Sequence, residues 1–328
     1  MANLRILGED DVRAAINADT ALDLARRTLK DQADGRSILS SPSAMVLDAT
    51  TLGGPRFKFK AAAVGHLNAS GIRLLSHPGP TAMKTCNYSA VYDHSGFLLS
   101  GLVSEQFLSR IRTAAFGAVA VEALANTGPV TVALFGTGGI AKEIVPMLGR
   151  VLNMTQLRVN SRRAESMQAF VAAHAPTLGC PMTAVSDGVE MVKDADVVIA
   201  ITEARSPLVL TGTLKPGAVV CSMGSYCEVD YGVLLEAQRF IVDDLDFAAE
   251  MGSGGGWIRQ GRMTRDAFHG RVDALACDVI AGKKPGRLLN TDRIVSIMQG
   301  MAIGDIAFAA HALREAEKLG RGTVVELP

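Results

Sequence analysis

A glycine-rich turn is the first feature of the sequence whose residue types and spacing could do chemistry. Residues 131–141 read TVALFGTGGIA, so an apolar run leads into a Gly-x-Gly-x-x-Ala turn, and a helical pattern follows. The first glycine of such a turn permits the tight bend, the second lets the backbone approach a pyrophosphate, and the small third residue lets the helix pack on the strand. The alternative is a strand–turn–helix connection that binds no ligand. The motif predicts a dinucleotide site built from Gly136, Thr137, Gly138, Gly139 and Ile140.

The residues at the end of the second predicted strand indicate which nicotinamide cofactor would bind. An NAD site usually carries a carboxylate about twenty residues after the glycines, where it accepts hydrogen bonds from the ribose hydroxyls. This position reads Asn160-Ser161-Arg162-Arg163 and has no carboxylate. Because guanidinium groups bind phosphate and a carboxylate would repel it, the sequence favours NADP(H) over NAD(H). In the alternative interpretation the two arginines are solvated charges that open a helix, and NAD still binds.

From residue 130 onward the sequence alternates between strand and helix patterns. Helical patterns such as 165–173 separate strands that we expect at 131–135, 156–160, 197–201, 218–223 and 240–242. This alternation predicts an α/β fold with a Rossmann-type, doubly wound parallel sheet.

The first part of the chain groups its strands together, which indicates a second domain of α+β type. The expected elements are strands at 57–64 and 89–92, a hairpin turn at 93–96, and helices at 20–30 (capped by Asp19 or Thr20), 105–125 and 305–319. We therefore expect a dinucleotide-binding domain at 126–299. Residues 1–125 together with 300–328 would form a substrate-binding and dimerisation domain.

The composition excludes several classes of function. The chain has 328 residues, which is enough for two domains. Of these residues 48% are hydrophobic and 20% are charged, a composition typical of a globular protein with a large core. The formal net charge is zero, so neither nucleic acid nor a membrane surface is favoured as a partner. The five cysteines include no CxxC pair, and no Cys/His cluster suggests a metal site. We interpret them as reduced thiols of a cytoplasmic protein.

Two further segments could suggest a function, but we interpret both as ordinary loops. Gly252-Ser-Gly-Gly-Gly256 is typical of a mobile loop. Asp243-Asp244-x-Asp246 could suggest a metal site, but no second group of ligands accompanies it, and we expect a solvated loop.

Several motifs occur in an order that resembles the ornithine cyclodeaminase/mu-crystallin family over nearly the whole chain. They are FKFK at 57–60, VYDxxG at 91–96, RTAA at 112–115, the glycine turn, DADVVIA at 194–200, LKPG at 214–217, and GMA at 300–302 followed by Asp305. The family includes cyclodeaminases, a type of alanine dehydrogenase, cyclic ketimine reductases and opine-like dehydrogenases. The resemblance implies a homodimer built through the first domain, with the active site in the cleft between domains.

The resemblance assigns the substrate carboxylate to Lys60 and Arg112. A 2-imino or 2-amino acid needs fixed cations at its carboxylate so that C2 can face the nicotinamide. Lys60 could instead be a strand-edge lysine that reaches solvent, and Arg112 could be a helix-surface arginine paired with Glu105 or Asp93. Lys84 and Tyr88 are candidate proton donors or substrate-orienting groups, with an ordinary polar strand face as the alternative. The predicted cofactor-binding set also includes Thr202, Met223, Gly224 and Gly300.

Two departures from the family pattern bear on the reaction. The position of an arginine that the family often carries near the start of the first domain is occupied by Ala44. The aspartate that cyclodeaminases use as acid and base is also missing, with Tyr226 in its place. Because a lyase that stores and returns its hydride needs that base twice, the sequence argues against ornithine cyclisation.

We therefore expect an NAD(P)H-dependent oxidoreductase that acts on the C=N/CH–N bond of a small amino acid or cyclic imino acid. One alternative is an ornithine cyclodeaminase-type ammonia lyase that recycles its NAD. Another is a non-catalytic protein that binds NADP(H) or a small ligand.

Overall fold

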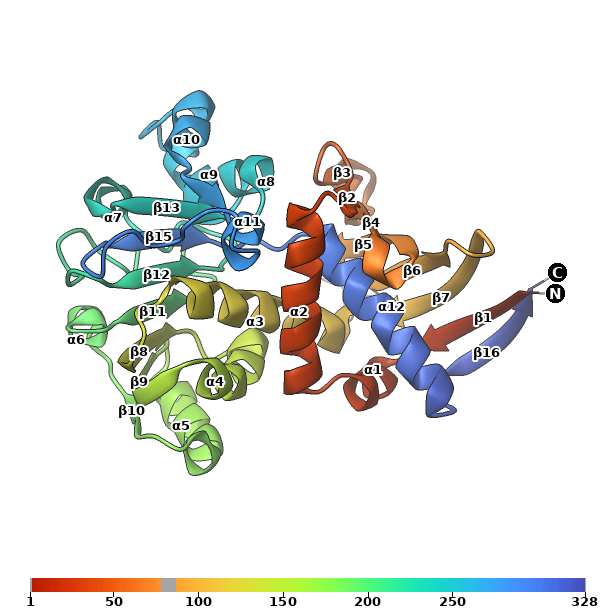
Figure 1. The fold of residues 1–328 in the computed structure, drawn as a ribbon, viewed down its shortest axis with the longest axis horizontal. Helices are drawn as coiled ribbons and strands as arrows, with labels where there is room; N and C mark the ends of the chain where they lie inside the picture. The colour runs from red at the N-terminus through yellow and green to blue at the C-terminus, as the bar shows by residue number, and fades with distance from the viewer. Residues whose placement is uncertain (1, 78–86, 328) are drawn as a thin grey trace. The chain divides into compact units, whose positions relative to one another are not determined.

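The structure, a computed structural model, describes residues 2–77 and 87–327 and divides into two compact units (Figure 1). Unit 1 comprises Met1–Thr113 and Met301–Pro328, and unit 2 comprises Ala114–Gly300. The division falls inside helix α3 (Glu105–Leu124), whereas we expected it after that helix. The second half of α3 thus belongs to unit 2.

Unit 1 is the α+β unit that the grouped strands predicted. Its elements are β1 (Ala2–Leu7), α1 (Glu9–Ala15), α2 (Ala18–Ala33), β2 (Ser37–Leu39), β3 (Met45–Asp48), η1 (Thr50–Leu52), β4 (Arg56–Val64), η2 (Gly65–Leu67), β5 (Ala69–His77), β6 (Tyr88–Asp93), β7 (Leu98–Ser104), the first half of α3, α12 (Ala302–Lys318) and β16 (Thr323–Leu327).

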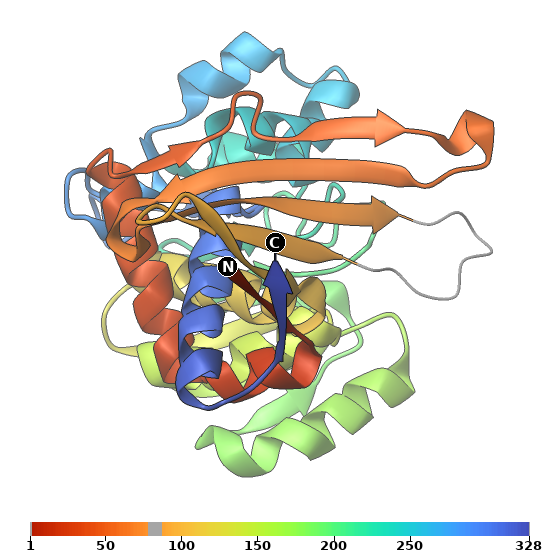
Figure 2. The same cartoon turned by 90° about the vertical axis from the view of Figure 1, so that its right-hand side faces the viewer.

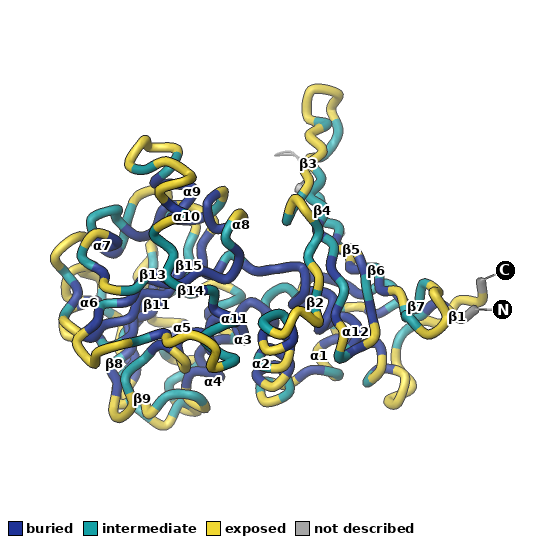
Figure 3. Tube along the Cα trace, turned by 45° about the horizontal axis from the view of Figure 1, so that its top comes forward, coloured by how far each residue is buried: buried dark blue, intermediate teal, exposed yellow. Residues whose placement is uncertain are grey.

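The described strands of unit 1 form one sheet in the order β16-β1-β7-β6-β5-β4-β2, with β3 paired to β4. Helix α12 packs against β4, β5, β6 and β7, with α1 and α2 beside it. Figure 2 shows the first and last strands, β1 and β16, side by side, as their antiparallel pairing requires. Figure 3 shows α12 as largely buried and β3 as exposed along its whole length.

Unit 2 is the Rossmann-type unit. Its elements after α3 are β8 (Pro129–Phe135), α4 (Gly139–Val151), β9 (Asn153–Asn160), α5 (Ala164–Leu178), β10 (Met182–Ala184), α6 (Gly188–Val192), β11 (Val197–Ala200), β12 (Val219–Ser222), α7 (Tyr231–Glu236), β13 (Arg239–Val242), α8 (Leu245–Glu250), α9 (Gly252–Arg259), α10 (Arg265–Arg271), β14 (Ala274–Leu275), α11 (Ala276–Ile280) and β15 (Ile294–Ile297).

The unit 2 strands pair in parallel in the order β10-β9-β8-β11-β12-β15-β13-β14. The chain order reverses between β8 and β11, and this switch point is where ligands bind in open α/β sheets. Apolar side chains of α6, α7, α9 and α10 pack on one face of the sheet, including buried Trp257 and Phe268. The doubly wound parallel sheet expected from the alternating pattern is confirmed.

Two local expectations were wrong for physical reasons, and one strand was missed. The glycine run at 252–256 is buried in α9, and the expected mobile loop is absent there: a Cβ at Gly254 would lie 2.3 Å from the Ala248 carbonyl oxygen. Close helix packing therefore requires the glycines. The cap of α2 is Asn17, whose side chain accepts the Thr20 N–H, rather than Asp19 or Thr20. Strand β15, buried in the middle of the sheet, had no alternating pattern by which to recognise it.

No helix among the described residues is long and apolar enough to cross a membrane.

Candidate functional site

The glycine turn of unit 2 has the geometry that a pyrophosphate requires. Gly136 has a φ of 110°, and a Cβ there would lie 2.3 Å from the Ile201 carbonyl oxygen, so only glycine fits. Gly138 is the N-cap of α4, and no atom lies within 4 Å of a Cβ placed on it. The first N–H groups of α4, from Gly139 onward, have no acceptor within the helix and are available to an anion. Thr137 and Ile140 flank the same turn and are half-buried.

The end of β9 holds the turn in place. The Asn160 carbonyl accepts the Gly136 N–H at 2.8 Å, and the Asn160 side-chain amide donates to the Val185 and Ser186 carbonyls. Arg162 and Arg163 are exposed, and Arg163 is the N-cap of α5. Ser161 is half-buried, and its hydroxyl donates to the Arg163 carbonyl at 3.3 Å.

A buried carboxylate that we did not anticipate organises the loops after β11 and β12. Glu228 accepts the Thr202 N–H at 2.5 Å, the Thr202 hydroxyl at 2.6 Å and the Gly224 N–H at 2.8 Å. Burial raises the pKa of Glu228, and these hydrogen bonds oppose that rise. Gly224 has to be glycine, because a Cβ would lie within 2.5 Å of the Glu228 carboxyl group. Met223 is buried beside Gly117 of α3.

Asp243 is a second buried carboxylate that binds a backbone N–H group, here at Gly300, the last residue of unit 2. It is 1% exposed and accepts the Gly300 N–H at 2.6 Å, while Gly300 has a φ of 81°. The neighbouring Asp244 caps α8 by accepting the Phe247 N–H. The expectation of a solvated loop at these two residues was therefore wrong. No group of His, Cys, Asp and Glu side chains that could hold a metal occurs among the described residues, here or elsewhere.

Unit 1 contains a cluster of buried charges, which we call the cation cluster. Its members are Lys58 and Lys60 on β4, Arg73 on β5, Glu105 and Arg112 on α3, and Asp305 on α12. Alternation along β4 places Lys58 and Lys60 on the face that also carries Ala62 and Val64, both buried. Arg73 pairs directly with Lys60 across the two strands. Sheet and helices thus bring these side chains together.

The two carboxylates of the cluster hold its two arginines. Asp305 is fully buried and lies 2.6 Å from Nε of Arg112 and 3.4 Å from Nη1 of Arg73. Glu105 lies 2.9 Å from Nε of Arg73 and accepts the Ser89 hydroxyl at 2.5 Å. Arg112 therefore pairs with Asp305, and neither Glu105 nor Asp93, the partners that we considered, takes this place. Asp305 also sits in the first turn of α12, where the helix dipole favours a negative charge.

The lysines of the cluster have strongly altered acid–base properties. Burial lowers the pKa of Lys60 to about 7, against the attraction of Asp305 and with further lowering by Lys58 and the arginines. Burial also lowers the pKa of Lys58 to about 8, and Arg73 and Arg112 add to this effect. Burial raises the pKa of Glu105, which Arg73 opposes. Both lysines consequently titrate near neutral pH, where an added anion would favour their charged form.

Not all of the predicted polar residues join this cluster. Tyr88 on β6 is 37% exposed and belongs to the opposite face of the sheet from Ser89, which contacts Glu105. The structure therefore does not bring Tyr88 to Lys60 and Arg112. Lys84 lies outside the described residues. Arg73 was missed, although an arginine at an inward position of an apolar strand is a usable signal.

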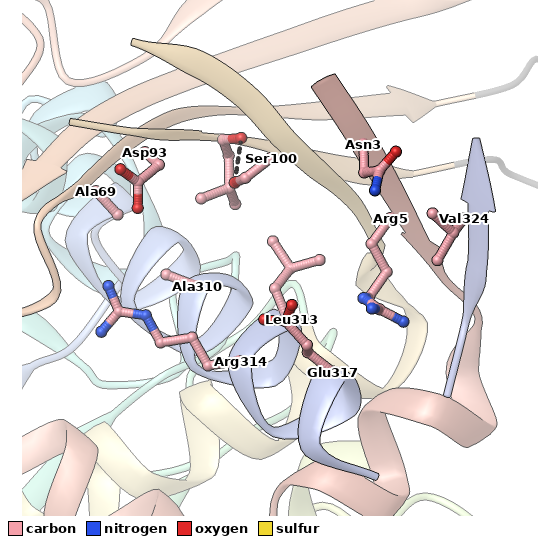
Figure 4. Close-up of a pocket in the computed structure, with 11 residues that line it drawn as sticks. Asn3, Arg5, Ala69, Asp93, Ser100, Ala310, Leu313, Arg314, Glu317 and Val324 are labelled. Atoms are coloured by element: carbon pink, nitrogen blue, oxygen red, sulfur yellow. Dashed lines mark hydrogen bonds between the residues drawn. The ribbon is translucent and has the colours of Figure 1, made fainter. Parts of the chain in front are cut away.

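A second group of charges lines a pocket of about 260 Å³ near the other end of α12 (Figure 4). Arg314 lies on the side of Asp93, and Arg5 lies on the side of Val324. Arg314 donates to the Leu67 carbonyl, and Arg5 donates to the Arg321 carbonyl at 2.6 Å. We call this the charge-balanced pocket, because Arg5 and Arg314 face two carboxylates, Asp93 and Glu317, in its lining.

Comparison with known proteins decides the family. The model of the ornithine cyclodeaminase/mu-crystallin family matches residues 76–318. The chain belongs to this family. The resemblance inferred from the sequence motifs is thereby confirmed.

Relatives of this family member have names that point to C–N chemistry. A Δ1-pyrroline-2-carboxylate reductase of Bacillus cereus is 27% identical over 230 residues, which cover 69% of each chain. The solved Thermococcus litoralis Δ1-pyrroline-2-carboxylate reductase, in complex with NADH and L-proline, has a TM-score of 0.87 at 19% identity and covers 98% of this chain and 99% of its own. An archaeal alanine dehydrogenase dimer with bound NAD has a TM-score of 0.89 at 20% identity and covers 99% of each chain. At these identities the two solved structures establish the fold.

Proposed function

We propose that this family member is an NAD(P)H-dependent oxidoreductase that acts on the C=N/CH–N bond of a small amino acid or cyclic imino acid. The observation that carries the proposal is the cation cluster, which keeps Lys60 and Arg112 buried on rigid elements. Such a cluster suits a carboxylate, because an anion lowers the electrostatic cost of buried cations. Membership of the family and the reductases and dehydrogenases among the relatives support the reaction class.

The residues of unit 2 fit a dinucleotide. Gly136 and Gly138 leave room for the pyrophosphate, and the N–H groups at the start of α4 would bind its oxygens. Thr202, Gly224 and Gly300, each held by a buried carboxylate, would support the nicotinamide end, with Met223 beside them. When bound, the reduced nicotinamide supplies a hydride to the imine carbon. Glu228 and Asp243 then act as positioning residues for the loops that receive the cofactor.

Lys60 and Arg112 would bind the substrate carboxylate and fix the orientation of C2. Asp305 would position the Arg112 guanidinium through the 2.6 Å ion pair. Reduction of an iminium needs no separate acid, because its nitrogen already carries the proton. The absence of the cyclodeaminase aspartate at Tyr226 is therefore compatible with reduction.

NADPH oxidation with a panel of cyclic imino acids, and with pyruvate plus amines, tests the proposal. We expect a loss of absorbance at about 340 nm, the band of the reduced nicotinamide whose hydride is transferred. Ammonia release from ornithine without a net change in this band would instead support the recycling lyase. Tight cofactor binding with no turnover on any substrate would support the non-catalytic binding protein.

We further propose that NADP(H) is preferred over NAD(H). Arg162 and Arg163 are exposed where a 2′-phosphate would lie, and Ser161 adds a hydroxyl. Replacing Arg162 with Ala should raise KM for NADPH more than KM for NADH. The control, Arg150→Ala, removes an exposed arginine of α4 whose side chain donates to the Pro146 carbonyl, and it should change neither KM. A wild-type enzyme that prefers NADH would contradict this assignment.

A homodimer through unit 1 is the assembly that we propose. The outer face of the unit 1 sheet leaves Ile72 46%, Tyr88 37% and Tyr92 40% exposed. An apolar sheet face of this kind is typical of an interaction surface. Sedimentation equilibrium should give twice the chain mass, and Ile72→Asp should favour the monomer; a wild-type monomer would contradict the proposal. The cytoplasmic location expected from the cysteines stays a prediction.

A further inference from the structure

The charge-balanced pocket lies entirely within unit 1, between the second half of α12 and the sheet (Figure 4). Helix α12 contributes Ala310, Leu313 and Glu317, whose spacing by three and four residues puts them on one helix face. Strand β1 contributes Asn3 and Arg5, which alternate and so share a strand face. The volume of about 260 Å³ equals the share of about nine water molecules in the liquid. A small amino acid has a similar number of non-hydrogen atoms, so one molecule would fill the pocket.

Part of the pocket lining is apolar and held in place. Ala69, Val91, Ala310 and Leu313 are each at most 7% exposed. A Cβ on Gly101 of β7 would lie 2.3 Å from Cδ2 of Leu313, so the helix reaches the sheet here only because this residue is a glycine. An apolar wall with a few charged groups is the usual composition of a small-molecule site. This part of the lining suits the apolar side chain of a ligand.

One pair of charged groups in the lining is already engaged within the protein. Arg314 donates to the Leu67 carbonyl, and Asp93 accepts the Ser95 N–H at 2.6 Å. The hydrogen bond from the Ser95 N–H lowers the pKa of Asp93, and the attraction of Arg314 adds to this effect. Asp93 and Arg314 therefore stabilise the rim of the pocket and are not the groups that we assign to a ligand.

The second pair, Arg5 and Glu317, has binding capacity to spare. Nη1 of Arg5 donates to the Arg321 carbonyl at 2.6 Å, and a Cβ on Gly322 would lie 3.3 Å from Cγ of Arg5, so the side chain is held in place. A guanidinium has five N–H donors, and the others can bind a carboxylate. Glu317 is exposed and forms no side-chain hydrogen bond or ion pair with the part of the chain that the structure describes.

We propose that the charge-balanced pocket is a binding site for a free amino acid with a small apolar side chain. The carboxylate of the ligand binds Arg5, its ammonium group binds Glu317, and its side chain contacts Leu313 and the other apolar residues of the lining. A zwitterion satisfies a cation and a carboxylate at once, whereas a simple acid or amine satisfies only one of them. The site is separate from the cation cluster, and no bond is formed or broken in it. The inference therefore goes beyond the proposed reaction.

Calorimetric titration with three related compounds tests the ligand class without any turnover. L-valine carries both charges, N-acetyl-L-valine lacks the ammonium group, and L-valinamide lacks the carboxylate. The wild type should bind L-valine more tightly than either derivative. Failure to bind L-valine, or equal affinity for all three compounds, would overturn the proposal.

Two variants test the assigned contacts. Arg5→Gln and Glu317→Gln should each weaken L-valine binding by about 10- to 100-fold, the range for one charge-assisted hydrogen bond. Arg5→Gln should also abolish the advantage of L-valine over L-valinamide, and Glu317→Gln its advantage over N-acetyl-L-valine. This crossed pattern distinguishes direct contact from a general loosening of the fold. Unchanged affinity in both variants would overturn the proposal.

Lys318→Gln is the matched control. Lys318 follows Glu317 on α12, is exposed, and pairs with Glu315 at 2.7 Å outside the pocket lining. The variant removes one charge and should bind L-valine as the wild type does. If L-valine binding is lost in Lys60→Met instead of the pocket variants, the amino acid occupies the cation cluster and the pocket proposal fails. If no imine is reduced but the crossed pattern holds, the proposed function fails and the pocket site stands.

Discussion

Arginine and carboxylate side chains lie near both ends of helix α12, but the balance of positive and negative charge differs between the two ends. At its start, Asp305 is fully buried in the cation cluster, whose described members are four cations and two carboxylates. About 13 Å further along the helix, Arg314 and Glu317 line the charge-balanced pocket, and both of its arginines donate to backbone carbonyls. The pocket is a cavity whose charges balance. Among the described residues the cluster has more cations than carboxylates, and such a surrounding suits an anionic ligand.

Loss of the Asp305 carboxylate should give the largest difference in stability between changes at the two ends of α12. Asp305→Asn keeps the shape of the side chain but leaves Arg73 and Arg112 buried without their shared partner. We expect a loss of about 3–5 kcal/mol in the free energy of unfolding, measured by urea denaturation. Glu317→Gln at the pocket end should change it by less than about 0.5 kcal/mol. Similar losses in both variants would remove the distinction.

Sequence reasoning predicted the glycine turn of unit 2 more completely than the cation cluster of unit 1. The turn at Gly136 and Gly138 is local, because a strand, two glycines and a helix follow each other within a few residues. Lys60 and Arg112 came from a family resemblance. Asp305, the ion-pair partner of Arg112, is almost 200 residues away from it in the sequence, and only the fold brings the two together.

The missed residues share a physical reason. Glu228 and Asp243 bind backbone N–H groups of distant loops, and such contacts leave no pattern of their own in the sequence. The glycines of α9 were misread because glycine serves both a loose loop and a tightly packed helix, and only the neighbours distinguish the two.

Guanidinium geometry should matter at the cluster and not at the pocket. Arg112→Lys keeps the charge but loses the planar fork that can bind a carboxylate through two hydrogen bonds. We expect kcat/KM for the acid substrate to fall by about 10- to 100-fold in steady-state assays. Arg314→Lys is the control and should leave kcat/KM unchanged. A fully active Arg112→Lys enzyme would argue against a carboxylate at this residue.

Stability should rise with pH because of Lys60. Its pKa is about 7 in the folded protein and about 10.5 in the unfolded chain, so between these values the unfolded state binds more protons. The electrostatic penalty is full below pH 7 and disappears towards pH 10.5. From pH 7.5 to 8.5 we expect a gain of up to about 1.4 kcal/mol in urea denaturation, the limit for one proton. Lys60→Met should flatten this dependence, and an unchanged slope would contradict the lowered pKa.

The smallest effect is expected on the outer face of the sheet. Tyr88 is exposed there and does not share the face of the cation cluster. Tyr88→Phe should therefore leave kcat and its pH profile unchanged in the reductase assay. A large fall in kcat would mean that this hydroxyl takes part in catalysis after all.

The central claim is that Lys60 and Arg112 of the cation cluster bind the acid group of the substrate. The most direct test compares NADPH oxidation with Δ1-pyrroline-2-carboxylate and with its methyl ester, which keeps the imine and removes the negative charge. We predict that kcat/KM for the ester is lower by about 100-fold or more, since interactions of both Lys60 and Arg112 are lost. In the Lys60→Met variant, acid and ester should differ much less. Equal rates on acid and ester by the wild type would contradict the account.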